Sequence, residues 1–231
     1  MAFQGYTQQT VDFMWGIRFN NERGWFLEHK DDYINTFLTP TRELGEQVYD
    51  AVHALLPDEP LMLKVSRIYR DARRLFGRGP YKDHLWWCIR TGDKDWTGRP
   101  TFWFELGPDY YSFGLGFWSP AAALMETYRK QIDAHPEELS KLVRQFNRQS
   151  VFTLDGPEYA RSKGQTSDLL RPWYQKKSLS LRWEGPLDER IFIPALAEDI
   201  IAGFKTLIPF YHYFNKLVAL TPQQERRGEE A

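Results

Sequence analysis

Residues 101–117 read TFWFELGPDYYSFGLGF. Two runs rich in aromatic and branched residues flank the GPD tripeptide, which is typical of a tight turn, so the stretch predicts a β-hairpin. Alternate positions of the second run share one face of a strand and are large and apolar: Tyr111, Phe113, Leu115 and Phe117. Gly114 and Gly116 fall on the opposite face, where they allow a helix, a neighbouring backbone or a ligand to approach closely.

Further strands are expected on both sides of this hairpin. LMLKVSRIY (61–69) and HLWWCIRT (84–91) precede it, and VFTLDG (151–156) and SLSLRWEG (178–185) follow it. Alternating apolar positions and short connections favour mainly antiparallel pairing.

Helical periodicity marks both ends of the chain. Helices are expected over 8–20 after an N-cap at Thr7, over 21–38, from Pro40 to about Leu56, over 119–134, over 136–147, and over 194–220 with a break or kink at Pro209. The predicted fold is therefore α+β, with N-terminal helices, a central mainly antiparallel sheet and C-terminal helices. We expect a single domain over residues 1–222 and a disordered polar tail over 223–231.

Composition narrows the class of protein. Hydrophobic residues make up 42% and charged residues 26% of the 231 residues, as in soluble globular proteins. The formal net charge of -1 argues against nucleic-acid binding by the protein as a whole. The single cysteine, Cys88, excludes an internal disulfide and fits a reducing compartment. The start lacks a signal-peptide pattern, and no apolar run has the length of a membrane span, so we expect a cytoplasmic protein with no membrane partner.

Basic charge gathers in one stretch, residues 64–82, KVSRIYRDARRLFGRGPYK. It holds seven basic side chains and one acidic one, although the chain as a whole is close to neutral. Two glycines and a proline predict that most of it forms a loop between two strands.

This stretch resembles the family grouped as domain of unknown function 2461. The family pattern is Arg-x-x-Arg-Asp-x-Arg-Phe followed by Lys and Pro-Tyr-Lys, and the matching positions here are Arg67, Arg70, Asp71, Arg73, Pro80, Tyr81 and Lys82. Arg74, Gly77 and Arg78 depart from the pattern and make the loop more basic and more flexible. NNERGWFLEHK, GLGFWSP and SKG resemble further blocks of the family. The resemblance implies an α+β fold and no particular reaction.

Arginine suits planar, bidentate recognition of phosphate or carboxylate. We therefore expect an anionic small molecule as the partner, with no cofactor. The predicted ligand-binding residues are Arg67, Arg70, Asp71, Arg73, Tyr81 and Lys82. Asp71 would orient a guanidinium, Tyr81 would donate a hydrogen bond, and Lys82 would add a point charge. In the alternative interpretation, Arg67 and Asp71 form an internal ion-pair network with the acids Glu22, Glu28, Asp31 and Asp32.

Two residues are candidates for proton transfer. Asp71 is a candidate acid or base, although nearby arginines would keep it ionised, which suits an orienting role better. His84 follows Tyr81 and Lys82 closely and is the other candidate. The five histidines are scattered and match no ligand spacing, so no metal site is expected. Cys88 is expected to be inert packing.

Tryptophans crowd the predicted sheet. Trp86 and Trp87 are adjacent and must point to opposite faces. We expect helices to cover both faces and bury these rings. The alternative is an exposed aromatic face on which a base or sugar stacks. This alternative, with the basic loop on phosphates, describes a nucleic-acid-associated module, and a third hypothesis makes the loop a protein-docking surface.

Overall fold

The computed structural model describes residues 2–92 and 95–222. The predicted tail, residues 223–231, lies outside these residues. A six-stranded sheet forms the centre, in the order β1-β2-β3-β4-β6-β5, and every neighbouring pair is antiparallel. The strands are β1 (Leu61–Val65), β2 (Leu85–Thr91), β3 (Pro100–Leu106), β4 (Tyr110–Phe117), β5 (Thr153–Asp155) and β6 (Ser180–Pro186). The expected hairpin is present, with Leu106 opposite Tyr111 and Trp103 opposite Gly114.

Helices precede and follow the sheet, which confirms the α+β class. The N-terminal helices are α1 (Gln8–Phe19), α2 (Arg23–Glu28), α3 (Lys30–Asp32), the π-helix η1 (Tyr33–Leu38) and α4 (Thr39–Leu55). The later ones are α5 (Ala122–Ala134), α6 (Pro136–Phe146), α7 (Arg171–Tyr174) and α8 (Ala195–Leu220). Short 3-10 turns are η2 (Ala72–Arg74), η3 (Trp96–Gly98) and η4 (Glu189–Phe192).

The helix predicted over 21–38 is wrong in two respects. It is interrupted at His29, whose ring stacks on Trp25 with centroids 4.0 Å apart, and its second part is a π-helix that continues directly into α4. Pro40 does not separate the two helices. Proline has no N–H to donate to the carbonyl of Thr36, and the Thr10 hydroxyl donates to that carbonyl instead, at 2.6 Å.

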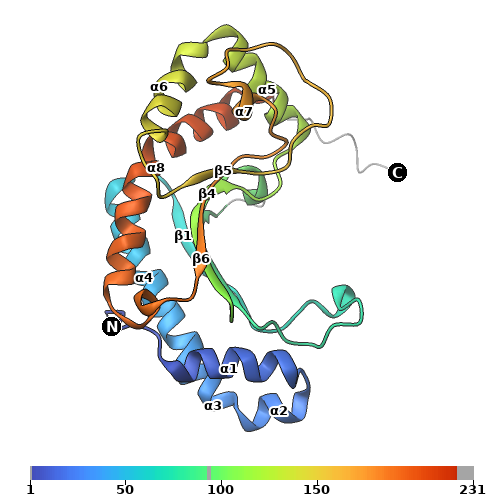
Figure 1. The fold of residues 1–231 in the computed structure, drawn as a ribbon, viewed down its shortest axis with the longest axis vertical. Coiled ribbons are helices and arrows are strands. Elements are labelled where there is room, and N and C mark those ends of the chain that lie inside the picture. The colour runs from blue at the N-terminus through green and yellow to red at the C-terminus, as the bar shows by residue number, and fades with distance from the viewer. Residues whose placement is uncertain (1, 93–94, 223–231) are drawn as a thin grey trace.

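The last helix, α8, runs through Pro209 without interruption. Its two halves point in different directions in Figure 1, as a proline that removes one helical hydrogen bond would cause. The predicted kink is therefore the better description, and the predicted break is not seen.

One face of the sheet is covered. Helices α4 and α8 pack on it, as Figure 1 shows to the left of the strands. The side chains between them are fully buried and mostly aromatic or branched: Trp87, Phe102, Phe104, Leu115, Leu181, Phe204 and Val48. Burying such side chains is the main favourable contribution to folding. We call this the covered face.

The opposite face, which we call the open face, carries no such helical layer (Figure 1). The expectation that helices cover both faces is wrong here: Trp86 and Trp103 are half-buried, and Trp118 at the end of β4 is 73% exposed. The two glycines of β4 lie on this face. A Cβ at Gly114 would collide with the backbone carbonyl of Leu181 on β6, so these glycines serve the approach of a neighbouring backbone.

Figure 1 also shows what flanks the open face. The loop between β1 and β2 projects from one end of the sheet, and the segment between β5 and α7 lies beyond the other end on the same side. The strands therefore form a floor between two projecting chain segments.

Candidate functional site

The base of the β1–β2 loop is an ordered ribbon. Tyr69 and Tyr81 face each other in an isolated antiparallel bridge. The Arg70 amide donates to the carbonyl of Pro80 at 2.8 Å, and the Lys82 amide donates to the carbonyl of Ile68 at 2.7 Å. The loop thus extends the β1–β2 pair, and the arginines at its base hold definite positions relative to the open face.

Asn21 ties this ribbon to the N-terminal helices. Its side-chain amide donates to the Tyr81 carbonyl, and its side-chain oxygen accepts from the Tyr81 amide, both at 2.9 Å. A Cβ at Gly79 would collide with the Asn21 side chain, so glycine is required beside this contact. The Asn-Asn and Pro-Tyr-Lys blocks noticed in the sequence therefore meet here, 60 residues apart.

The Tyr81 ring lies in the core. It is 4% exposed and stacks on Phe26 with centroids 4.3 Å apart. Burial raises the pKa of its hydroxyl. This position gives Tyr81 a packing role at the loop base, and its predicted hydrogen bond to a ligand stays a prediction.

Arg67, Arg70 and Lys82 come together at the loop base. Burial and the charge of Arg70 lower the pKa of the Lys82 ammonium to about 8, with Glu105 opposing the shift and Arg67 adding to it. Arg70 is half-buried and donates from Nε to the Tyr81 carbonyl at 2.8 Å. Arg67 is exposed and, within the described residues, forms no ion pair or hydrogen bond. The three side chains form the cationic cluster of the site.

Arg73 and Asp71 lie apart from this cluster, at the loop tip. Arg73 donates from its guanidinium to both carboxylate oxygens of Asp71, at 3.0 and 2.9 Å, and its side chain is 88% exposed. Asp71 also caps the 3-10 turn η2 by accepting from the Arg73 amide. Asp71 does orient a guanidinium, but it is that of Arg73. The alternative network is not seen, because no ion pair joins Arg67 or Asp71 to the acids of the N-terminal helices among the described residues.

His84 is held by its neighbour Asp83. The His84 Nδ1 lies 2.9 Å from Asp83 Oδ1, and since a carboxylate only accepts, Nδ1 carries the proton. Arg18 donates to the other oxygen at 2.6 Å. These hydrogen bonds, that of His84 first, hold the pKa of Asp83 well below its usual range although burial opposes them. His84 is half-buried, beside Lys82 in the chain.

A cavity of about 400 Å³ lies on the open face. Its walls are mainly aromatic, from Trp86, Trp96, Trp103, Phe117 and Trp118, and its polar lining comes from Glu105, Ser112, Asp155, Ser180 and Arg182. Lys82 is not one of its lining residues, but its Nζ lies 5.6 Å from the centre of the Trp86 ring, which forms part of the wall. The cavity and the cationic cluster are therefore adjacent.

Two more cations lie over tryptophans of this face. The Arg90 guanidinium is 4.7 Å from the Trp96 ring centre, and that of Arg182 is 5.9 Å from the Trp103 ring centre. Gly114 pairs with Trp103 on one side and with Arg182 on the other. Because Gly114 has no side chain, Arg182 can reach across β4 to Trp103.

The acids of the cavity are engaged by protein partners. Glu105 accepts a hydrogen bond from the Tyr110 hydroxyl, and burial, followed by this contact, raises the pKa of Tyr110. Asp155 lies 3.5 Å from Arg182, which also pairs with Glu184. The Nε of Arg182 is buried and has no hydrogen-bond partner within the described chain. The site thus combines flat aromatic walls with cations at its rim.

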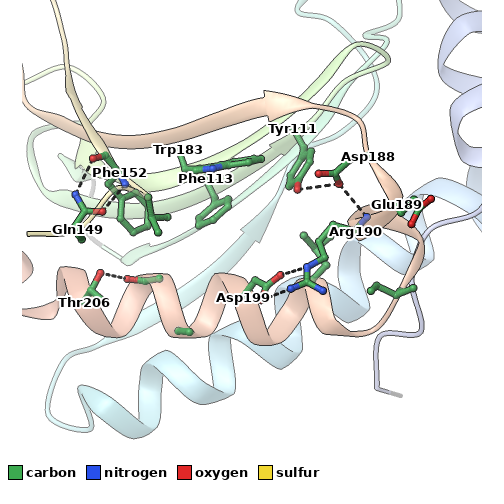
Figure 2. A pocket seen from close by; sticks show the side chains of 15 residues that line it. Tyr111, Phe113, Gln149, Phe152, Trp183, Asp188, Glu189, Arg190, Asp199 and Thr206 are labelled. Atoms are coloured by element: carbon green, nitrogen blue, oxygen red, sulfur yellow. Dashed lines mark hydrogen bonds and ion pairs between the residues drawn. The ribbon is translucent and has the colours of Figure 1, made fainter.

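A larger cavity, of about 810 Å³, lies between the sheet and α8 (Figure 2). Phe113, Trp183 and Phe152 form its aromatic wall. Figure 2 shows its charged end, where Arg190 pairs with Asp199 and the Tyr111 hydroxyl donates to Asp188. None of the predicted site residues lines either cavity, and the one lining cation of each, Arg190 here and Arg182 on the open face, is already paired. The cavities differ in that a predicted site residue, Lys82, lies over a ring in the wall of the open-face cavity, that of Trp86.

Three further observations concern the described part of the chain. Across residues 2–92 and 95–222, no group of three or more His, Cys, Asp and Glu side chains is placed to hold a metal ion. No helix in the described part of the chain is long and apolar enough to cross a membrane. Cys88 is buried on the open face, and burial raises the pKa of its thiol to about 11.

Residues 9–213 match the family described as conserved hypothetical protein (DUF2461). The chain belongs to the DUF2461 family. The match includes the loop base, the Asn21 contact and most of the cavity, so the site described here lies within the family region. No curated protein matches the chain.

Sequence reasoning missed several residues of this site. The sequence marks Asn21 only as part of a family block, and no motif includes Glu105 or Arg182. Strand alternation did contain a signal, because Trp103, Glu105 and Arg182 all fall on the face opposite the apolar one. That they meet depends on the pairing register of β3, β4 and β6, which the spacing within one strand does not specify.

Proposed function

We propose that this protein binds an anionic small molecule that carries a planar ring. The ring would lie against Trp86 and Trp103, and the phosphate or carboxylate group would contact Arg67, Arg70 and Lys82. The observation that supports this most directly is the half-buried Lys82 over the Trp86 ring, part of the wall of an aromatic cavity, with its pKa lowered to about 8.

The charge arrangement favours an anionic ligand. Lys82 forms no ion pair within the described residues, and Glu105, which opposes its pKa shift, accepts a hydrogen bond from Tyr110. Arg70 lies 4.0 Å from Asp83, so the three cations of the cluster have fewer acids than charges beside them. Gathering cations without equal countercharge is unfavourable, and an anion bound between them removes that cost. The planar guanidiniums of Arg67 and Arg70 suit bidentate contact with carboxylate or phosphate oxygens.

The walls of the cavity favour a ring. Flat aromatic surfaces stack on other rings, and each stacked base contributes about 1–3 kcal/mol in proteins that bind nucleotides this way. A cavity of about 400 Å³ is within the range of small-molecule sites, roughly 300–1,000 Å³. A ring-bearing anion would use both the walls and the rim.

The proposal revises the roles expected for the motif. Asp71 and Arg73 pair with each other at the loop tip, and Tyr81 supports the loop base from the core. If the protein is an enzyme, His84 is the better candidate for proton transfer, because Asp83 fixes its tautomer.

Equilibrium binding tests the proposal with three probes at equal ionic strength: adenosine monophosphate, benzoate and inorganic phosphate. We expect a ring-bearing probe to bind about tenfold more tightly than inorganic phosphate, a difference of about 1.4 kcal/mol. Lys82→Met and Trp86→Ala should each weaken that binding by a similar factor, and Arg73→Ala should not change it. Wild-type affinity for the ring-bearing probe in Lys82→Met or in Trp86→Ala would contradict the proposal.

A second candidate function is binding of single-stranded nucleic acid. It is favoured by the three tryptophans of the open face that each carry a cation, because such pairs suit successive stacked bases. A short oligothymidylate should then bind more tightly than adenosine monophosphate, with an affinity that falls steeply as salt rises. If the oligonucleotide binds no better than the mononucleotide, the small-molecule proposal stands and this one fails.

A further inference from the structure

A second group of unpaired cations surrounds one tyrosine at the other end of the open face. The Lys163 ammonium lies 4.3 Å from the centre of the Tyr159 ring, the Arg129 guanidinium 5.2 Å, and the Lys177 ammonium 5.5 Å. Arg129 belongs to α5, Lys163 to the β5–α7 segment, and Lys177 follows α7. Residues distant in the sequence therefore converge on one ring, and we call them the Tyr159 cluster.

The Tyr159 cluster lacks matching acids. Within the described residues, none of its three cations forms an ion pair. The nearby carboxylates have other partners: Glu158 pairs with Lys176 at 3.0 Å, Asp133 accepts from the Tyr174 hydroxyl at 3.1 Å, and Glu126, one turn before Arg129, pairs with Lys130 at 2.8 Å. The Nη1 of Arg129 is buried and has no hydrogen-bond partner within the described chain. A buried charged donor without a partner is costly, and an anion can supply the missing acceptor.

The backbone around the cluster is held in place before any ligand binds. The Tyr159 amide donates to the Gln175 carbonyl at 3.0 Å, and the Lys177 amide donates to the Pro157 carbonyl at 2.7 Å. The Lys163 amide donates to the side-chain oxygen of Gln175 at 3.3 Å. Lys163 is the central residue of the SKG block noticed in the sequence, which the site at the loop base does not use. These contacts reduce the entropy that ligand binding would cost.

We propose that the Tyr159 cluster is a second anion site, specific for a phosphate group. Three converging cations favour a dianionic phosphate over a singly charged carboxylate, because the attraction grows with the charge of the ligand. Arg129 and the two lysines would contact the phosphate oxygens, and the tyrosine ring would support the ammonium groups between them. The site is separate from Arg67, Arg70 and Lys82, because the β1–β2 loop to which they belong projects from the end of the sheet opposite the β5–α7 segment (Figure 1).

Titration with inorganic phosphate tests this site, followed by amide chemical shifts and repeated with acetate at equal ionic strength. We expect phosphate to shift amides of residues 159–163 and 175–177 in a saturable way, and acetate to bind about tenfold more weakly or not at all. Lys163→Ala should weaken phosphate binding about tenfold, since Lys163 is exposed and its loss should not disturb folding. Lys177→Ala, also at an exposed position, should do the same.

Two controls separate this inference from the proposed function and from general charge effects. Lys82→Met should leave phosphate binding at the Tyr159 cluster unchanged. Lys141→Ala removes an exposed lysine of α6 and should have no effect. Loss of binding in Lys141→Ala equal to that in Lys163→Ala, or shifts that acetate reproduces, would overturn the proposal.

Discussion

Trp86 and Trp87 are neighbours in β2, and they face two different environments. Trp87 is fully buried under α4 and α8, stacked on Phe104 with ring centres 5.4 Å apart. Trp86 faces the other way, half-buried in the wall of the open cavity, with Lys82 above its ring. The same residue type therefore contributes to the core on one face of the sheet and to the wall of an open cavity on the other.

The two faces differ in how their polar groups are satisfied. The covered face is nearly all apolar, so its stability comes from burial and packing. The open face combines tryptophans with cations, and several of these cations have no protein acid beside them. The covered face therefore holds the fold together, and the open face is where we propose that the ligand binds.

The largest expected effect is a difference in stability between alanine substitutions of the two tryptophans. Trp87→Ala should destabilise the protein by about 3–5 kcal/mol, because it removes a large buried ring and leaves a cavity. Trp86→Ala should cost about 1 kcal/mol or less, because its ring is partly in solvent already. Urea denaturation measures both, and equal losses would mean that the open face is also part of the stabilising core.

The next largest effect is the loss of stability when the hydrogen bonds between Asn21 and Tyr81, at the loop base, are removed. Asn21→Ala should cost about 2 kcal/mol, since it removes two hydrogen bonds and leaves the Tyr81 amide and carbonyl without those partners. Asn20→Ala is the matched control, because its side chain makes one exposed hydrogen bond, to the Gly16 carbonyl, and should cost about 0.5–1 kcal/mol. If the two substitutions cost the same, the Asn21 contact does not hold the loop base in place.

Asp83 should make the free energy of unfolding depend on pH in the acidic range. Its pKa in the folded state lies well below its usual range, whereas the pKa of an Asp in the unfolded chain is about 3.9. The ionised Asp83 side chain therefore contributes fully to stability above about pH 4. This contribution is lost as pH falls towards the folded-state pKa. Asp83→Asn should cost on the order of 1–2 kcal/mol at pH 7, discounted because Arg18 is partly exposed. Urea denaturation between pH 7 and pH 3 should show the difference from wild type shrinking, and a constant difference would contradict this.

The smallest effect tests the cost of keeping a cation on the open face. The pKa of Lys82 is lowered to about 8 on folding from about 10.4, so its charged form destabilises the folded state at pH 7. Lys82→Met should therefore raise stability by about 1 kcal/mol at pH 7, after allowance for solvent screening. Between about pH 8 and pH 10.4 the unfolded wild type binds more protons, so wild-type stability should rise relative to the variant.

Lys64→Met is the control for this prediction, because Lys64 is an exposed lysine of β1 on the same face and should show neither effect. Affinity for an anionic probe should also fall as pH rises through about 8 in wild type and not in Lys82→Arg. A wild-type affinity that is constant across pH 8 would exclude Lys82 as a ligand contact.

Local patterns in the sequence determined much of this protein. Alternation predicted the strands and assigned Trp86 and Trp87 to opposite faces, because side-chain direction in a strand repeats every two residues. The helical ends and the β3–β4 hairpin followed from the same kind of local rule. The Arg67–Lys82 stretch could also be identified as the place where basic charge concentrates, since charge is a property of composition.

The tertiary structure decided which residues meet. Arg67 and Arg70 join Lys82 while Arg73 points away, although the three arginines are evenly spaced, because the bridge between Tyr69 and Tyr81 ends before Arg73. Asn21 reaches Tyr81 across 60 residues, and Arg182 reaches Trp103 only because Gly114 lies between them in the sheet. Which face the helices leave open depends on how whole elements pack, and no spacing within a single segment contains that information.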